Sequence, residues 1–149
     1  MRDWDARHLA AAAGATLVRA PSGATGRGAT GPPGPTGVSI DSRALAPGEL
    51  FVGLRGERVD GGDHAAQALA EGAWGVLVAP EHAHAAAEAT GAAPEPVGGR
   101  GAVLAHEDPL AGLQALARAW RRELRSRGAM VVAITGSTGK TSTKDILAA

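Results

Sequence analysis

The residues best suited to chemistry lie near the end of the sequence, in Gly136-Ser-Thr-Gly-Lys-Thr-Ser142. Gly136 and Gly139 permit backbone angles closed to other residues and let the chain approach a ligand closely. Backbone N–H groups of such a turn, with a helix N-terminus behind them, form a concave anion site. Lys140 can reach the β- and γ-phosphates of a nucleotide, and the Thr141 hydroxyl can ligate Mg²⁺. We therefore expect a nucleotide site, with phosphate contacts from Gly136, Ser137, Thr138, Gly139, Lys140, Thr141 and Ser142.

The spacing of this loop is shorter than the common eight-residue phosphate-loop pattern, because Ile134 stands where that pattern has its first glycine. The surrounding sequence supports the nucleotide interpretation. Met130–Ile134 is an apolar, mostly β-branched run typical of a buried strand, and Thr141–Ala149 can begin a helix. A structural strand–turn–helix without a ligand is the alternative.

Two other groups of polar residues allow both a functional and a structural interpretation. Asp41-Ser42-Arg43 follows a predicted strand, and its structural interpretation is a strand-end turn with a surface ion pair. His64 is a weak candidate for a ligand or base, and a solvent-exposed histidine at a helix start is the simpler interpretation. The arginines at positions 118, 121, 122, 125 and 127 predict a solvated helix face, with a nucleic-acid patch as the alternative.

The composition excludes several classes of protein. The formal net charge is zero and aromatic residues make up only 3%, which disfavours nucleic-acid binding. No cysteine is present, so disulfides and zinc–thiolate sites are excluded. No apolar run approaches the roughly 20 residues of a membrane helix, and the acidic start does not resemble a signal peptide. A cytoplasmic protein without membrane insertion is expected.

Hydrophobic periodicity predicts an α/β fold, because expected strands and helices alternate along the chain. We expect a small α/β domain over residues 1–127 and the truncated start of a second domain over 128–149. A flexible loop rich in Gly and Pro, residues 21–37, interrupts the first. The expected helices are Asp5–Ala13, Asp63–Glu71 with Asp63 as its N-cap, Glu81–Thr90, and Asp108–Arg127. The expected strands are Ala15–Ala20, Val38–Asp41, Leu50–Leu54, Trp74–Ala79 and Ala102–Ala105.

Three segments resemble the Mur ligases, which use ATP to build the peptide stem of peptidoglycan. They are Ile134–Ser142, Val38–Arg43 and Pro47–Glu57, and they stand in the family's order. The resemblance implies a UDP-MurNAc-binding domain followed by a P-loop ATPase-like central domain. It also implies ATP and Mg²⁺ as cofactors, an acyl phosphate intermediate and Lys140 as a catalytic residue. Ser42 and Arg43 are the implied contacts to the UDP end of the substrate. A monomer without nucleic-acid partners is expected.

Within the family, Thr143-Lys144-Asp145 and the opening His8–Gly14 are similar to the MurF type, which joins D-alanyl-D-alanine to UDP-MurNAc-tripeptide. The alternatives are a MurE-type ligase, which adds the third stem residue, and a non-catalytic UDP-sugar or nucleotide-binding module. The sequence departs from the family at Gly62 and His64, where relatives have a histidine and an aromatic residue. The remaining catalytic groups are expected beyond Ala149, so the chain alone is expected to be inactive.

Overall fold

The computed structural model describes residues 3–22, 34–92, 101–131 and 135. The chain divides into two compact units, residues 1–119 and residues 120–149.

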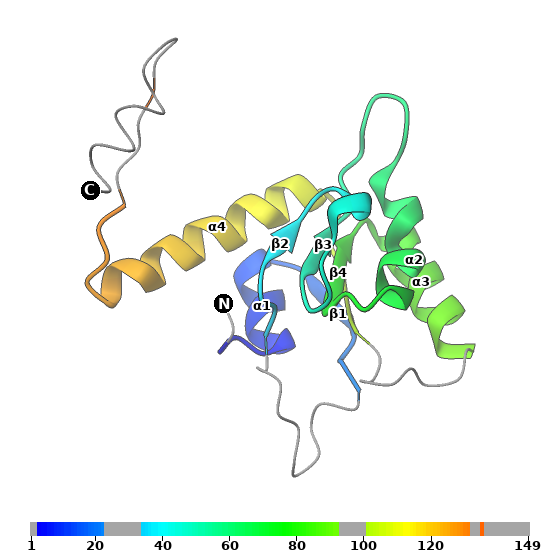
Figure 1. Cartoon of the computed structure of the whole chain (residues 1–149), viewed down its shortest axis with the longest axis horizontal. Helices are drawn as coiled ribbons and strands as arrows, with labels where there is room; N and C mark the ends of the chain where they lie inside the picture. The colour runs from blue at the N-terminus through cyan, green and yellow to red at the C-terminus, as the bar shows by residue number, and fades with distance from the viewer. Residues whose placement is uncertain (1–2, 23–33, 93–100, 132–134, 136–149) are drawn as a thin grey trace. The chain divides into compact units, whose positions relative to one another are not determined.

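A five-stranded sheet forms the centre of the first unit, with strand order β1-β5-β4-β3-β2 (Figure 1). The strands are β1 (Thr16–Arg19), β2 (Val38–Ser39), β3 (Leu50–Val52), β4 (Gly75–Val78) and β5 (Ala102–Ala105). Strands β2 to β5 are parallel, and β1 pairs with β5 in the antiparallel direction. Every residue of β3, β4 and β5 is buried, as expected where helices cover both faces of a parallel sheet.

Among the described residues there are four α-helices and two short 3₁₀ helices. They are α1 (Ala6–Ala13), η1 (Ser42–Ala44), η2 (Gly61–His64), α2 (Ala65–Ala70), α3 (Pro80–Ala92) and α4 (Pro109–Ser126). Asp5 caps α1 by accepting a hydrogen bond from the His8 backbone N–H at 2.8 Å. Gly14 ends α1 with a φ of 67°, a left-handed conformation that favours glycine.

The side chains of the sheet alternate between two covered faces. Phe51, Val76 and Val103 point to the face where they form a core with alanines of α2 and α3. Leu77 lies on the other face, where it approaches Gly112 of α4. Figure 1 shows α2 and α3 on one side of the sheet and α1 on the other. Because the buried helix residues are mostly alanine, α2 and α3 can approach the sheet closely.

The predicted α/β fold is confirmed, and the predicted strands and helices of the first unit occur near their expected places. One prediction is wrong in detail: Asp63 does not cap the helix after β3. A short 3₁₀ helix, η2, precedes α2, and Asp60 caps it by accepting from the Gly62 backbone N–H at 2.9 Å. The cap therefore lies three residues earlier than the sequence pattern indicated.

The second unit contains the end of α4 and the segment after it. Arg127 forms an ion pair with Glu123 at 2.8 Å, and its guanidinium lies over the Trp120 ring at 5.9 Å. Gly128 follows with a φ of 85°. Met130 and Val131 do not form the start of the predicted strand, since a strand requires a paired neighbour and neither residue is paired within the described part of the chain. Residues 132–134 and the phosphate loop, 136–142, lie outside the described residues.

Replacing a fully buried leucine of the sheet will measure how much this alanine-rich core depends on its larger side chains. Leu77→Ala should lower the free energy of unfolding by about 2–5 kcal/mol, because it removes buried apolar contacts and leaves a cavity. Urea denaturation followed by tryptophan fluorescence will measure it. Leu110→Ala is the matched control, since Leu110 is 48% exposed. This substitution should lower the free energy of unfolding by less than about 1 kcal/mol. Equal losses in both variants would contradict the assignment of the core.

Candidate functional site

A pocket of about 260 Å³ lies in the first unit, where the parallel strands β3, β4 and β5 end. Ligands of open α/β sheets bind outside the carboxyl ends of the strands, so this is where a site is expected. The lining residues come from the segments that leave these three strands and from the start of α4. They are Gly53, Leu54, Arg55, Asp60, Ala79, Glu107, Asp108, Pro109 and Leu110.

The segment after β3 folds back on itself and carries two of the charged lining residues. Arg55 and Asp60 face each other in an isolated antiparallel bridge, and the Gly61 backbone N–H donates to the Leu54 carbonyl at 2.9 Å. A side chain at Gly53 would clash with the Gly62 nitrogen at 2.8 Å. Glycine is therefore needed for the backbone to pass this closely, and the fold-back holds Arg55 and Asp60 at the edge of the sheet.

The Asp60 carboxylate joins three segments. It accepts a hydrogen bond from the Gly62 backbone N–H at 2.9 Å, and its Oδ2 lies 3.2 Å from Arg55 Nε and 3.3 Å from His82 Nε2. The hydrogen bond from Gly62, followed by those from Arg55 and His82, holds the pKa of Asp60 below its ordinary value. The His82 side chain, which is 19% exposed, packs directly over Gly62, so a side chain at position 62 would collide with its ring.

Arg55 is held from two sides. Besides Asp60, its Nη2 atom lies 3.0 Å from Glu81 Oε1 at the start of α3. The hydrogen bond with Asp60 is the main cause that raises the pKa of Arg55 above its ordinary value. A guanidinium has five N–H donors, and these two ion pairs leave donors for a further partner in the pocket. The arrangement can therefore present a fixed hydrogen-bond donor to a ligand.

The segment after β5 supplies the remaining acids of the pocket. Asp108 caps α4, because its Oδ1 accepts from the backbone N–H groups of Leu110 at 3.0 Å and Ala111 at 3.1 Å. The Asp108 N–H in turn donates to His106 Nδ1 at 2.9 Å. The start of α4 is thus satisfied by its own cap. Glu107 is exposed and lines the pocket beside it.

Ser42 and Arg43, the predicted contacts to a UDP group, lie in η1 directly after β2, so they belong to the same edge of the sheet. They are not among the residues that line the pocket. Asp41 caps η1 through the Arg43 backbone N–H at 3.0 Å and pairs with the Arg43 guanidinium at 3.1 Å. The side-chain hydrogen bond from Arg43 lowers the pKa of Asp41. The strand-end turn with a surface ion pair is therefore present, and the Arg43 side chain is 89% exposed.

The other sequence candidates have simpler positions. His64 is half-buried at the end of η2, not fully exposed as expected. The described residues contain no group of three or more His, Asp or Glu arranged to hold a metal. The predicted Mg²⁺ ligand, Thr141, and the catalytic Lys140 lie outside the described residues. Among the described helices, none combines the length and apolar character that a membrane crossing requires.

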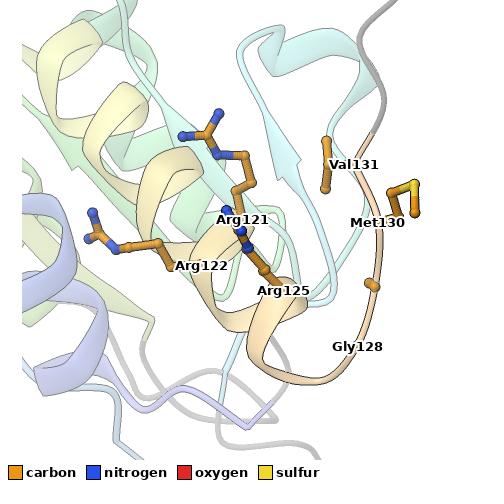
Figure 2. A pocket seen from close by; sticks show the side chains of 7 residues that line it. Arg121, Arg122, Arg125, Gly128, Met130 and Val131 are labelled. Carbon is orange, nitrogen blue, oxygen red and sulfur yellow. The ribbon is translucent and has the colours of Figure 1, made fainter.

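A second pocket, of about 570 Å³, lies within the second unit. Its lining residues are Arg121, Arg122, Arg125, Gly128, Ala129, Met130 and Val131. In Figure 2, Arg121 and Arg125 lie on the side of the helix that faces Val131, while Arg122 extends away from it. All three arginines are exposed, as the prediction of a solvated helix face requires. The Met130 side chain is 87% exposed.

Comparison with known proteins assigns the chain to a family. The model of the Mur ligase family, catalytic domain, matches residues 35–121. The chain belongs to the Mur ligase family. The match contains all of the pocket-lining residues of the first unit, together with Ser42 and Arg43.

Several relatives carry the name UDP-N-acetylmuramoyl-tripeptide–D-alanyl-D-alanine ligase. The Mycobacterium leprae protein is 43% identical over an alignment that covers 91% of this chain and 26% of the relative. The Mycobacterium tuberculosis protein is 46% identical, and its alignment covers 75% of this chain and 23% of the relative. A Prochlorococcus marinus protein named as a 2,6-diaminopimelate ligase is 40% identical over 74% and 20%. A crystal structure of MurF from Acinetobacter baumannii matches this chain with a TM-score of 0.62 and 29% identity. The match covers 97% of this chain and 26% of the MurF chain. The chain thus spans about a quarter of the length of these proteins.

Sequence reasoning missed the charged cluster around Asp60. The sequence patterns assign no role to Asp60, Arg55, Glu81 or His82. The bridge between Arg55 and Asp60 spans a short turn that the sequence could have indicated. The contact from His82 joins two elements 22 positions apart, and no local pattern predicts it.

Replacing Asp60 tests whether its carboxylate fixes this edge. Asp60→Ala should lower the free energy of unfolding by about 1–2 kcal/mol, because the cap of η2 and the partner of Arg55 are both lost. Asp60→Asn should cost less, since its amide oxygen can still accept from the Gly62 N–H. Glu88→Ala, which removes an exposed carboxylate of α3, is the control and should have little effect.

The pH dependence gives a second readout of the same interaction. The folded pKa of Asp60 lies below the ordinary value of 3.8, so its contribution is complete above that pH and is lost as the pH falls through the folded pKa. The stability difference between the wild-type chain and Asp60→Asn should therefore be constant at neutral pH and shrink below about 3.8. Urea denaturation at a series of pH values measures it. A difference that does not change down to acidic pH would contradict this role.

Proposed function

We propose that this chain supplies the sugar-nucleotide-binding part of an ATP-dependent ligase that joins D-alanyl-D-alanine to UDP-MurNAc-tripeptide. The observation that carries the proposal is the identity of 43–46% with proteins named for this activity. The MurF structure that matches 97% of the chain supports the same branch. The chain covers only about a quarter of these proteins, so the activity of the whole enzyme is inferred from them.

The first domain, residues 1–127, is proposed to bind the UDP-MurNAc part of the substrate at the carboxyl edge of its sheet. Ser42 and Arg43 are the proposed contacts to the UDP end. The exposed guanidinium of Arg43 uses Nε and Nη2 to bind Asp41, and its remaining N–H donors can serve a phosphate oxygen. The ion pair with Asp41 orients the guanidinium beside the end of β2. Its role would be to anchor the nucleotide end of the substrate.

Residues 128–149 are proposed to begin the domain that binds ATP and Mg²⁺. This proposal rests on the sequence of the phosphate loop, since its residues lie outside those described. When bound, ATP supplies the phosphoryl group that activates the substrate carboxylate. Lys140 and the loop amides from Gly136 to Ser142 would neutralise and position the phosphates, and Thr141 would hold Mg²⁺. Positioning and charge neutralisation are the main contributions a protein makes to phosphoryl transfer.

A MurE-type ligase, which adds the third stem residue, is the alternative that a specific observation favours, because a relative named for diaminopimelate addition is 40% identical. The two activities use different pairs of substrates. A MurF-type ligase joins a dipeptide to a UDP-MurNAc-tripeptide, and a MurE-type ligase joins a single amino acid to a UDP-MurNAc-dipeptide. Comparing the two pairs of substrates in an enzyme that contains this chain distinguishes them. A non-catalytic UDP-sugar-binding module would bind the nucleotide but form no amide bond with either pair.

Calorimetric titration of the chain with UDP and with UDP-MurNAc-tripeptide tests the substrate site. Both ligands should bind, and Arg43→Ala should weaken both by about tenfold, as expected for one lost charged hydrogen bond. Arg118→Ala, which removes an exposed arginine elsewhere in the first unit, is the control. A folded chain that binds neither ligand would contradict the proposed function. Binding that Arg43→Ala leaves unchanged would reduce the Asp41–Arg43 pair to a structural role.

Replacing Lys140 tests the phosphate loop. In an enzyme that contains this chain, Lys140→Ala should lower the ATP-dependent rate of amide formation by about 100-fold or more, because a preorganised cation at the transferred phosphoryl group is lost. Phosphate release measured with saturating substrates provides the rate. Lys144→Ala removes a lysine four residues later and should leave most of the activity. Similar rates in the wild type and Lys140→Ala would exclude the loop as the ATP site.

A further inference from the structure

The charges of the strand-edge pocket are unfavourable for an anion. One guanidinium, Arg55, and three carboxylates, Asp60, Glu107 and Asp108, line it. Glu81 adds a fourth carboxylate beside Arg55. The positive charge of Arg55 offsets only one of these four negative charges, so the net charge of the group is negative. A diphosphate placed inside the pocket would meet like charges at short range, which is costly in a partly desolvated site.

Two of the three lining carboxylates are already engaged. Asp108 caps α4 through two backbone N–H groups, and Asp60 binds Gly62, Arg55 and His82. Within the described part of the chain, no hydrogen bond or ion pair engages the carboxylate of Glu107. Both of its oxygens are therefore available as acceptors at the wall of the pocket.

The remaining walls are mostly apolar. Leu54 and Leu110 lie on the segments that carry Arg55 and Glu107, and Ala79 and Pro109 complete the lining between them. Leu110 is among the large hydrophobic side chains that the first unit exposes. The volume of about 260 Å³ equals roughly nine water molecules at about 30 Å³ each, which is room for a single ring rather than a whole sugar nucleotide.

We propose that this pocket binds a neutral, hydroxyl-bearing ring of the sugar-nucleotide substrate, with Glu107 accepting hydrogen bonds from its hydroxyls and Leu54 and Leu110 packing against the ring. This inference rests on the proposed function. A carboxylate at the end of a parallel strand suits ribose hydroxyls, because its two oxygens can accept from two neighbouring O–H groups. The diphosphate stays outside the pocket, and Arg55 donates from its free N–H groups to the same ring. The ribose and the amino sugar share this chemistry.

Calorimetry with UDP, 2′-deoxy-UDP and UDP-N-acetylglucosamine tests the proposal on the whole chain. If the ribose occupies the pocket, Glu107→Ala should weaken UDP and UDP-N-acetylglucosamine by the same factor, about tenfold. The wild type should then bind 2′-deoxy-UDP more weakly than UDP, and Glu107→Ala should bind both alike. If the amino sugar occupies it, Glu107→Ala should weaken only UDP-N-acetylglucosamine. Either pattern supports a ring bound through Glu107.

Glu88→Ala is the matched control, because it removes another exposed glutamate from the same unit. Glu107→Gln provides a second variant of nearly the same shape, and thermal melting checks that each variant is folded. If Glu107→Ala and Glu107→Gln bind all three ligands as tightly as Glu88→Ala does, the inference about Glu107 is overturned. The proposed binding of UDP by the chain would still stand. A folded wild-type chain that binds none of the ligands would overturn the proposed function and this inference together.

Discussion

The geometry of the candidate site depends on a single carboxylate, that of Asp60. It lies 2.9 Å from the Gly62 nitrogen, 3.2 Å from Arg55 Nε and 3.3 Å from His82 Nε2. These contacts join the turn after β3, the short helix η2 and the helix α3, and the Arg55–Glu81 pair at 3.0 Å and the His82–Asp63 pair at 3.5 Å add to them. Hydrogen bonds to an ionised acceptor are stronger than neutral ones, so one group can hold three segments together. The position of Arg55 at the pocket follows from this.

The pocket lies where it does because of the sheet order. Parallel strands β3, β4 and β5 place their carboxyl ends side by side, and each continues into a segment that contributes lining residues. The polar groups divide into two kinds. Asp60 and Asp108 are engaged in caps and ion pairs that shape the walls. Glu107 and the free N–H groups of Arg55 are left to recognise a ligand. A neutral ring fits this balance better than a phosphate does.

The sequence predicts the interior of this fold better than its edge. The buried strands β4 and β5 read as continuous apolar runs, and the helices α1 and α4 begin close to their expected starts. The antiparallel pairing of β1 was not predicted, because strand order depends on contacts distant in sequence. The contact from His82 was not predicted for the same reason. Asp63 was predicted as the cap because the pattern did not indicate that the short helix η2 precedes α2. The roles of Ser42, Arg43 and the phosphate loop stay predictions.

The most direct test of the central claim is to follow the backbone amides of the isotopically labelled chain by NMR during titration with UDP. A site at the carboxyl edge of the sheet predicts saturable shifts in Gly53 to Arg55 and in His106 to Leu110, together with Ser42 and Arg43. The amides of α1 should stay unchanged, since that helix covers a face of the sheet rather than its carboxyl edge (Figure 1). Saturable shifts confined to α1 or α3, with none at the strand ends, would contradict the account.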